Sequence, residues 1–321
     1  MPEEIKENFY RIEVPLPGNP LRSINSYLIK GQKGNLIIDL GMNRVECSTF
    51  LFRVLEELEV DLSSTDFFIT HLHADHMGLL NQVAHQSSSI YFNAIEAEII
   101  SGEFWSYFLD LARWNGFPVQ ELELAIKKHP GYRYGLESIP EFTLLSEGEL
   151  LEIGGYSFQC LETPGHSPGH LCLYEPEQKI LVAGDLILED ITPNIVAWGE
   201  GDNPLSDYLK SLDKIYDLEV ELVLPGHRRV FSSCRGRIEE LRDHHQQRAQ
   251  EILSILGNDK MDAYQVAARM NWDLSYDSWE QFPIPQRWFA MGEAHAHLLF
   301  LMHEERVIKE IVNDQVLYSR I

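Results

Sequence analysis

Three histidines and an aspartate crowd one short turn of this 321-residue chain. Residues 70–78 read Thr-His-Leu-His-Ala-Asp-His-Met-Gly, so His71, His73, Asp75 and His76 lie within six residues. Burying three imidazoles beside a carboxylate is costly unless a positive group pairs with the carboxylate and fixes the imidazole tautomers. A divalent metal ion does both, and nitrogen and oxygen atoms are common ligands of zinc. We therefore expect this turn to bind metal and disfavour a purely structural role.

An apolar strand leads into the turn. Residues 65–70, Thr-Asp-Phe-Phe-Ile-Thr, are aromatic and β-branched and predict a buried strand. A site at the end of such a strand is typical of α/β proteins, because a rigid sheet positions side chains that the next loop exposes. Alternation places both histidines of His-x-His on one side, and the Asp-His step then turns the chain. Two groups of ligands can therefore face two different ions.

Four further segments repeat the pattern of apolar strand, turn and potential ligand. In these segments Asp39 follows Asn-Leu-Ile-Ile, His166 follows Pro-Gly, Asp185 follows Ala-Gly and His227 follows Pro-Gly. Each segment alone is equally compatible with a turn that has no function. Five such strand ends in one chain are much harder to explain as turns alone.

In this order, the five segments resemble the signature motifs of the metallo-β-lactamase-fold hydrolases. The resemblance runs from about residue 10 to about residue 235 and includes residues 13–17 and 25–29, which are similar to the opening strands of that family. It implies an α/β fold, a four-layer αββα sandwich. It also implies a complete set of ligands for two metals: His71, His73, Asp75, His76, His166, Asp185 and His227.

The resemblance gives each of these positions a role. The first metal would be held by three histidines, His71, His73 and His166. The second would be held by Asp75, His76 and His227, with Asp185 bridging the two. Asp39 would orient the ligand loop without touching metal, and Asp75 could also carry a proton to the leaving group.

The implied enzyme is a binuclear metal-dependent hydrolase. Two divalent ions about 3.5–4 Å apart make a bridging hydroxide available at neutral pH and polarise a carbonyl or phosphoryl oxygen. Zinc is the favoured metal, and iron or manganese suit mixed His and Asp ligands nearly as well.

A long insertion, about residues 93–142, separates the second and third motifs. Residues 94–114 carry apolar side chains at helical spacing, residues 118–128 predict a second helix, and a loop with two tyrosines follows. Two interpretations are open: a helical hairpin packed against the sheets, or a cap whose aromatics face the metals. The aromatics in question are Phe104, Trp105, Phe108 and Trp114. Such a wall suits acyl, aryl or lactone groups better than a bare phosphate.

From about residue 236 the pattern becomes helical. Helices are expected over 237–256, from Asp262 or a neighbour to 270, and over 285–304, followed by a hairpin that turns at residues 313–314. This region resembles the winged-helix appendage of one branch of the family. We therefore expect a catalytic domain over 1–235 and a winged-helix-like domain over 236–321.

The C-terminal region is expected to serve packing or homodimer formation. Residues 240–321 contain 13 acidic and 8 basic side chains, a net charge of −5, which removes the electrostatic basis for binding DNA. His295, His297 and His303 are expected in packing, because no carboxylate or cysteine completes a second metal site at obvious spacing. His170 either supports the metal site or simply begins a strand.

The charge of the whole chain excludes several further classes. A formal net charge of −24 disfavours general binding to nucleic acid and to anionic membranes. The four cysteines are far apart and predict small buried side chains or idle thiols. The first residues lack the apolar core of a secretory signal, and no apolar stretch approaches a membrane span. We expect a cytoplasmic protein.

The substrate is inferred from features that the chain lacks. Zinc β-lactamases of the main class have a cysteine where Asp185 stands, and the basic arm of the tRNA-processing members is missing. The expected reaction is hydrolysis of a small molecule: a thioester, lactone or other activated ester with an apolar acyl part. The alternatives are an endoribonuclease acting on single-stranded RNA and an iron-dependent oxidoreductase on the same fold. A binding module without catalysis is least favoured.

Overall fold

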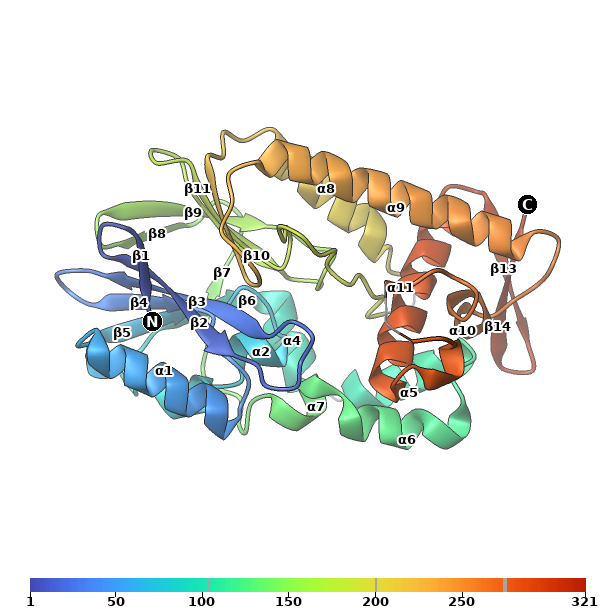
Figure 1. The fold of residues 1–321 in the computed structure, drawn as a ribbon, viewed down its shortest axis with the longest axis horizontal. Helices are drawn as coiled ribbons and strands as arrows, with labels where there is room; N and C mark the ends of the chain where they lie inside the picture. Colours follow the sequence, from blue (N-terminus) through green and yellow to red (C-terminus); the bar gives the residue numbers. More distant parts are fainter. Residues whose placement is uncertain (103, 200, 274–275) are drawn as a thin grey trace.

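Two mixed β-sheets face each other in this computed structural model, and a helical region flanks them (Figure 1). The structure describes residues 1–102, 104–199, 201–273 and 276–321. Glu103, within the helix expected over 94–114, and residues 274–275 of the expected C-terminal domain lie outside the described residues, as does Glu200. The predicted α/β architecture with two sheets and a C-terminal helical region is confirmed.

The first sheet has seven strands in sequence order. Pairing is antiparallel from β1 to β4 and parallel from β4 to β7. The strand expected over 65–70 ends at Phe68, and the last two residues already belong to the ligand turn. The strands are β1 Glu3–Lys6, β2 Phe9–Pro15, β3 Ser23–Lys30, β4 Asn35–Ile38, β5 Thr65–Phe68, β6 Ile90–Asn93 and β7 Thr143–Leu145.

The second sheet has five strands in the order β12-β11-β10-β9-β8. Only β11 and β12 pair in parallel; the other neighbours in this sheet of described strands are antiparallel. The strands are β8 Leu150–Ile153, β9 Tyr156–Glu162, β10 Leu171–Glu175, β11 Ile180–Gly184 and β12 Leu222–Pro225.

Apolar side chains fill the space between the sheets and cover both outer faces. Phe68 of the first sheet and Phe158 of the second meet in one buried cluster. Helix α1 (Val45–Glu57) turns Cys47, Leu51, Val54 and Leu55 toward the first sheet, as a period of 3.6 residues requires. Helices α8 (Pro204–Tyr216) and α9 (Cys234–Leu256) cover the second sheet (Figure 1). The layers are therefore helix, sheet, sheet, helix.

The insertion differs from the prediction in two places. The single helix expected over 94–114 is two helices, α4 (Ala94–Ser101) and α5 (Phe104–Trp114), because the backbone at Gly102 is extended. The expected loop after α6 (Val119–Lys128) contains helix α7 (Pro130–Tyr134), which starts with a proline and is capped by the side chain of His129.

The C-terminal helices and hairpin are found close to their predicted positions. Helix α9 is followed by α10 (Ala263–Ala267), α11 (Ile284–His303), β13 (Val307–Val312) and β14 (Gln315–Arg320). Asp262 caps α10 in a capping box with Gln265, as expected. Asn313 and Asp314 both have positive φ angles, which is the backbone of a tight two-residue hairpin turn.

The insertion and the C-terminal region share one hydrophobic core, here called the C-terminal core. Phe117 and Ile126 of the insertion pack in the same cluster as Leu253 of α9 and Leu298 of α11. The backbone oxygen of Asn115 accepts a hydrogen bond from the Tyr264 N–H (3.0 Å). The first half of α9 packs on the second sheet and its second half lies in this core (Figure 1). The boundary at residue 235 stays a prediction.

The described residues bear on two further expectations, that no segment spans a membrane and that the cysteines are buried or idle. None of the helices that the described residues form combines the length and hydrophobicity needed to cross a bilayer. All four cysteines are buried and free, as predicted.

Candidate metal centre

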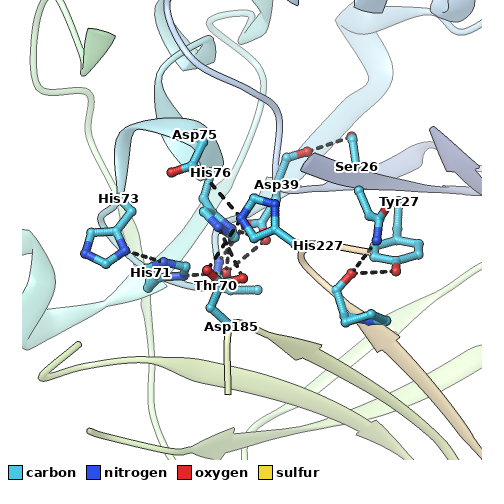
Figure 2. A network of polar contacts seen from close by, with 12 residues as sticks. Ser26, Tyr27, Asp39, Thr70, His71, His73, Asp75, His76, Asp185 and His227 are labelled. Carbon is cyan, nitrogen blue, oxygen red and sulfur yellow. Dashed lines mark hydrogen bonds and ion pairs between the residues drawn. The ribbon is translucent and has the colours of Figure 1, made fainter. Parts of the chain in front are cut away.

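All seven predicted ligands meet at the carboxyl ends of the strands, between the two sheets. Six of them are labelled in Figure 2, and His166 is the seventh. The turn after β5 carries His71 and His73, and the short helix α2 (Ala74–Met77) carries Asp75 and His76. The other three follow β9, β11 and β12: His166, Asp185 and His227.

Three histidine nitrogens converge on one point. His73 Nδ1 lies 2.9 Å from His71 Nε2 and 3.0 Å from His166 Nε2. Burial lowers the pKa of His73 to about 3 and that of His71 well below its ordinary value, so both rings are neutral. Nitrogen lone pairs this close repel one another unless a cation lies between them.

The second group joins two carboxylates to two histidines. His227 Nε2 lies 3.3 Å from Asp75 Oδ2 and 3.5 Å from Asp185 Oδ2. Asp185 Oδ1 lies 3.6 Å from His76 Nε2, and Asp185 Oδ2 lies 3.6 Å from His166 Nε2 in the first group. Asp185 therefore stands between the two groups, where a bridging ligand would stand.

The charges and the unpaired atoms of this group fit a cation. Burial alone would raise the pKa of Asp75, but its contact with His227 and the nearby His76 lower it to about 2. Three buried atoms find no hydrogen-bond partner among the described residues: His76 Nε2, His227 Nε2 and Asp185 Oδ1. Buried polar atoms are rarely left unpaired. Together, the clusters are consistent with a binuclear metal site.

Hydrogen bonds behind the ligands fix their orientation. Asp39 accepts from the Thr70 N–H and hydroxyl, both at 2.9 Å, and lies 2.7 Å from His76 Nδ1 (Figure 2). His227 Nδ1 donates to the Ser23 carbonyl at 2.7 Å, and His166 Nδ1 donates to the Asn194 carbonyl at 2.8 Å. With these protons on Nδ1, each Nε2 presents a lone pair to the centre.

His170 has both of the roles that the sequence left open, because it supports the metal site and also leads into a strand. It directly precedes β10, and its Nε2 accepts from the backbone N–H of Asp185 at 3.1 Å. Its Nδ1 then donates to the Thr163 hydroxyl at 2.8 Å. The ring thus holds the backbone of Asp185 in place.

Glu96 is a buried residue that the sequence analysis missed. From α4, it accepts hydrogen bonds from the Leu72 N–H, the Ser167 hydroxyl and, at 3.0 Å, the Gly169 N–H. Burial raises the pKa of Glu96 to about 7, while the three donors favour the ionised form. The carboxylate ties the turn of His71 and His73 to the turn of His166. Nothing in the local sequence distinguishes it from a surface glutamate on a helix.

A cavity of about 840 Å³ opens onto the centre at His73, Asp75, His166 and Asp185. Helices α5 and α11 supply much of its apolar wall: Phe104, Trp105, Phe108, Trp288 and Phe289.

Three of the four predicted wall aromatics border this cavity, but the prediction for Trp114 is wrong. Trp114 lies nine positions after Trp105 on the same helix, which places their side chains on opposite faces. Trp114 instead borders a small separate cavity beside Tyr318. Trp198, which the sequence analysis did not single out, stacks on His73 with ring centroids 6.1 Å apart.

The C-terminal region supports one of the ligands through Asn194. The side-chain amide of Asn194 donates to Glu293 Oε2 of α11 at 3.3 Å, while the Asn194 carbonyl accepts from His166. Arg248 of α9 lies 3.3 Å from Glu293 Oε1. The region thus contributes to the site as well as to packing.

The histidines of α11 do not form a second metal site. His295 and His297 are buried, whereas His303 is exposed. Within the described part of the chain, every group of side chains able to hold a metal lies at the centre above. The prediction that these histidines serve packing is confirmed for His295 and His297.

Comparison with known proteins gives three informative similarities. The family model described as "Metallo-beta-lactamase superfamily" matches residues 19–227. The Bacillus subtilis (strain 168) protein called "Probable metallo-hydrolase YqjP" is 28% identical over 313 residues, 94% of each chain. Human "Acyl-coenzyme A thioesterase MBLAC2" is 26% identical over 248 residues, 72% of this chain and 79% of the relative.

A solved structure is similar along nearly the whole chain. It is that of a metallo-beta-lactamase family protein from Thermus thermophilus, with a TM-score of 0.82 and 26% identity. The similarity covers 99% of this chain and 100% of that one, so it includes the C-terminal region.

Proposed function

The chain belongs to the metallo-beta-lactamase superfamily and is a metallo-hydrolase with a His/Asp metal-binding cluster. From this premise we propose that it hydrolyses thioesters, lactones or other activated esters with an apolar acyl part. One observation carries the proposal: the aromatic cavity of about 840 Å³ that opens directly onto the cluster. Pockets of this size and lining suit apolar groups of small-molecule size.

The seven clustered side chains would hold two ions, and we favour zinc. When bound, such ions lower the pKa of water and polarise the scissile carbonyl. Asp39, Asn194 and the Ser23 carbonyl keep the imidazoles in the tautomer that a metal needs. The fit rests on the orphaned Nε2 and carboxylate atoms, which no described residue satisfies.

Asp75 is the residue to which we assign proton transfer. Its carboxylate borders the cavity, so it can receive a proton at one oxygen and release it to the leaving group. Its low pKa favours the unprotonated form before reaction. The aromatic wall of the cavity would exclude water from the acyl group.

The charges that line the cavity weigh against the ribonuclease alternative. Arg133 is the single lysine or arginine among the described residues that border the cavity, which also include Glu137 and Asp273. RNA binding requires several cations to neutralise phosphates. No observation favours an iron-dependent oxidoreductase over a hydrolase. A small uncharged ester or thioester fits this lining best.

The relatives and the C-terminal topology support two finer proposals. The name of MBLAC2 specifies an acyl-thioester substrate, which agrees with the thioester half of the proposal. Three helices, a terminal hairpin and the bridge between Met261 and Tyr318 support a winged-helix-like C-terminal domain. We expect no DNA binding by that domain, because its net charge is negative. Homodimer formation and a cytoplasmic location stay predictions.

A pair of tryptophan variants tests the acyl cavity. The metal-loaded protein is assayed on acyl thioesters of increasing chain length, together with lactones, phosphodiesters and RNA. Trp105→Ala should cost about 1–3 kcal/mol of binding, mostly for long acyl groups. Trp114→Ala removes the same side chain from the opposite face of α5 and should not change chain-length preference.

Either of two experimental outcomes would refute the proposal. If Trp105→Ala loses activity equally at all chain lengths, the ring supports the fold and not the substrate. If the wild type prefers RNA to every ester and thioester, the alternative function is correct.

A further inference from the structure

We propose that His129 is a hydrogen-bond donor in the acyl cavity, and that it selects acyl groups with an oxygen acceptor several carbons from the scissile carbonyl. A ketone, hydroxyl or ether oxygen would serve. The inference rests on the proposed function and adds to it a specificity-determining residue and a substrate class.

The position of the proton on His129 follows from its contacts. The side chain lies between α6 and α7, where its Nδ1 accepts the backbone N–H of Gly131 at 3.1 Å. Burial lowers the pKa of His129 to about 4, so the ring is neutral near pH 7. A neutral imidazole whose Nδ1 is an acceptor carries its proton on Nε2. The ring therefore has one N–H donor, at Nε2.

That donor lies among aromatic rings. The centroid of His129 is 5.1 Å from Trp105, 5.1 Å from Phe289 and 6.4 Å from Trp288. All four side chains border the cavity. No described residue offers Nε2 an acceptor, and this atom of a residue that borders the cavity keeps some solvent-accessible surface. A polar group of this kind in an apolar pocket fixes the orientation of a ligand.

The route from the centre to His129 sets the place of the acceptor along the acyl chain. Ring contacts run from His73 to Trp198 (6.1 Å), to Phe104 (6.4 Å), to Trp105 (4.6 Å) and to His129 (5.1 Å). His129 is thus several side chains away from the ligands. An acceptor that reaches His129 must therefore lie well beyond the first carbons of the acyl chain.

Matched substrates measure this selection without confusion from the leaving group. We suggest the N-acetylcysteamine thioesters of decanoic, 5-oxodecanoic, 7-oxodecanoic and 9-oxodecanoic acid, whose ketones are too distant to activate the scissile carbonyl. In the wild type, kcat/KM for the best oxo substrate should exceed that for the decanoyl thioester about tenfold, because a buried donor left unpaired is costly.

Two variants separate the donor from the cap of α7. His129→Asn keeps an oxygen that can accept the Gly131 N–H but has no group at the position of Nε2. His129→Gln keeps a donor at about that position. The oxo-to-decanoyl ratio should fall to about one in His129→Asn and be partly retained in His129→Gln. Because each ratio is taken within one variant, a change in stability or overall rate cancels.

A binding measurement keeps the test independent of turnover. Thioether analogues, with CH₂ in place of the scissile carbonyl, are titrated by calorimetry with and without the oxo group. Equal wild-type affinities for the matched pair would overturn the role of His129, even in an active thioesterase. Absence of hydrolysis of every ester and thioester would instead refute the proposed function, while the calorimetric ratio would still decide the role of His129.

Discussion

Replacing Glu96 by glutamine should loosen the metal centre from outside the ligand set. Glu96 Oε1 accepts from the Ser167 hydroxyl and the Gly169 N–H, and Oε2 accepts from the Leu72 N–H. A glutamine amide has one oxygen and one NH₂ group. In its better orientation the oxygen keeps Ser167 and Gly169, and the NH₂ group then faces the Leu72 N–H.

The size of the effect follows from that one mismatch. One hydrogen bond is lost, and the Leu72 N–H and the new NH₂ group are both left without an acceptor; each unpaired buried donor costs about 1–3 kcal/mol of unfolding free energy. Leu72 lies between the predicted ligands His71 and His73, so the mismatch moves their turn. Loss of outer contacts of this kind typically lowers metal affinity by about 10–100-fold.

Two measurements on purified protein check this prediction. Urea denaturation of the metal-free protein gives the change in unfolding free energy, and competition with a chelator gives the change in zinc affinity. Glu98→Gln is the matched control, because Glu98 lies on the same helix and makes no side-chain hydrogen bond with another described residue. Unchanged stability and zinc affinity in Glu96→Gln would refute the view that this carboxylate ties the two ligand turns together.

Three further predictions concern the ligands, the C-terminal core and pH. Asp185→Ala should lower bound metal and reduce turnover by orders of magnitude; full metal content by mass spectrometry at full rate would exclude a bridging role. Truncation after residue 240 should expose Phe117 and Ile126 of the insertion to limited proteolysis; an insertion that stays resistant would show that it folds alone. Burial lowers the pKa of His297 to about 4 in the folded chain, whereas the same imidazole has a pKa of about 6.5 in the unfolded chain. Between these two values the unfolded chain takes up a proton at His297 and the folded chain does not. Stability present above about pH 6.5 should therefore be lost as the pH falls toward 4, and His297→Gln should make that slope shallower by up to about 1.4 kcal/mol per pH unit. If urea denaturation gives the same slope of unfolding free energy against pH in His297→Gln and in the wild type, this prediction is contradicted.

The local patterns that sequence makes visible were predicted best. Apolar strands that lead into Asp39, His71 and Asp185 are found as expected, because alternation and turn residues are local signals. The capping box at Asp262 and the turn at Asn313 are equally local and equally correct. These features depend on neighbours in the chain, which a sequence displays directly.

Features that depend on distant neighbours were missed. Glu96 bonds to turns on both sides of the insertion, and Trp198 reaches His73 from another loop, so no spacing marks either residue. Helical periodicity did place Trp105 and Trp114 on one helix, yet it could not say which face meets the cavity. The shared core of insertion and C-terminal region decides that face, and it forms only in three dimensions.

The C-terminal core also sets the order in which this enzyme can mature on the ribosome. Residues 105–128 are translated long before α11 and the hairpin that complete their hydrophobic cluster. At about 5–20 residues per second, the aromatic side of the insertion waits roughly ten seconds or more for its partners. The nascent chain can build its sheets and ligand turns in that interval, but the wall of the cavity closes last. A chain that ends before α11 would therefore lack Trp288 and Phe289 from the wall of the cavity, and would also lack the Glu293 contact that supports Asn194.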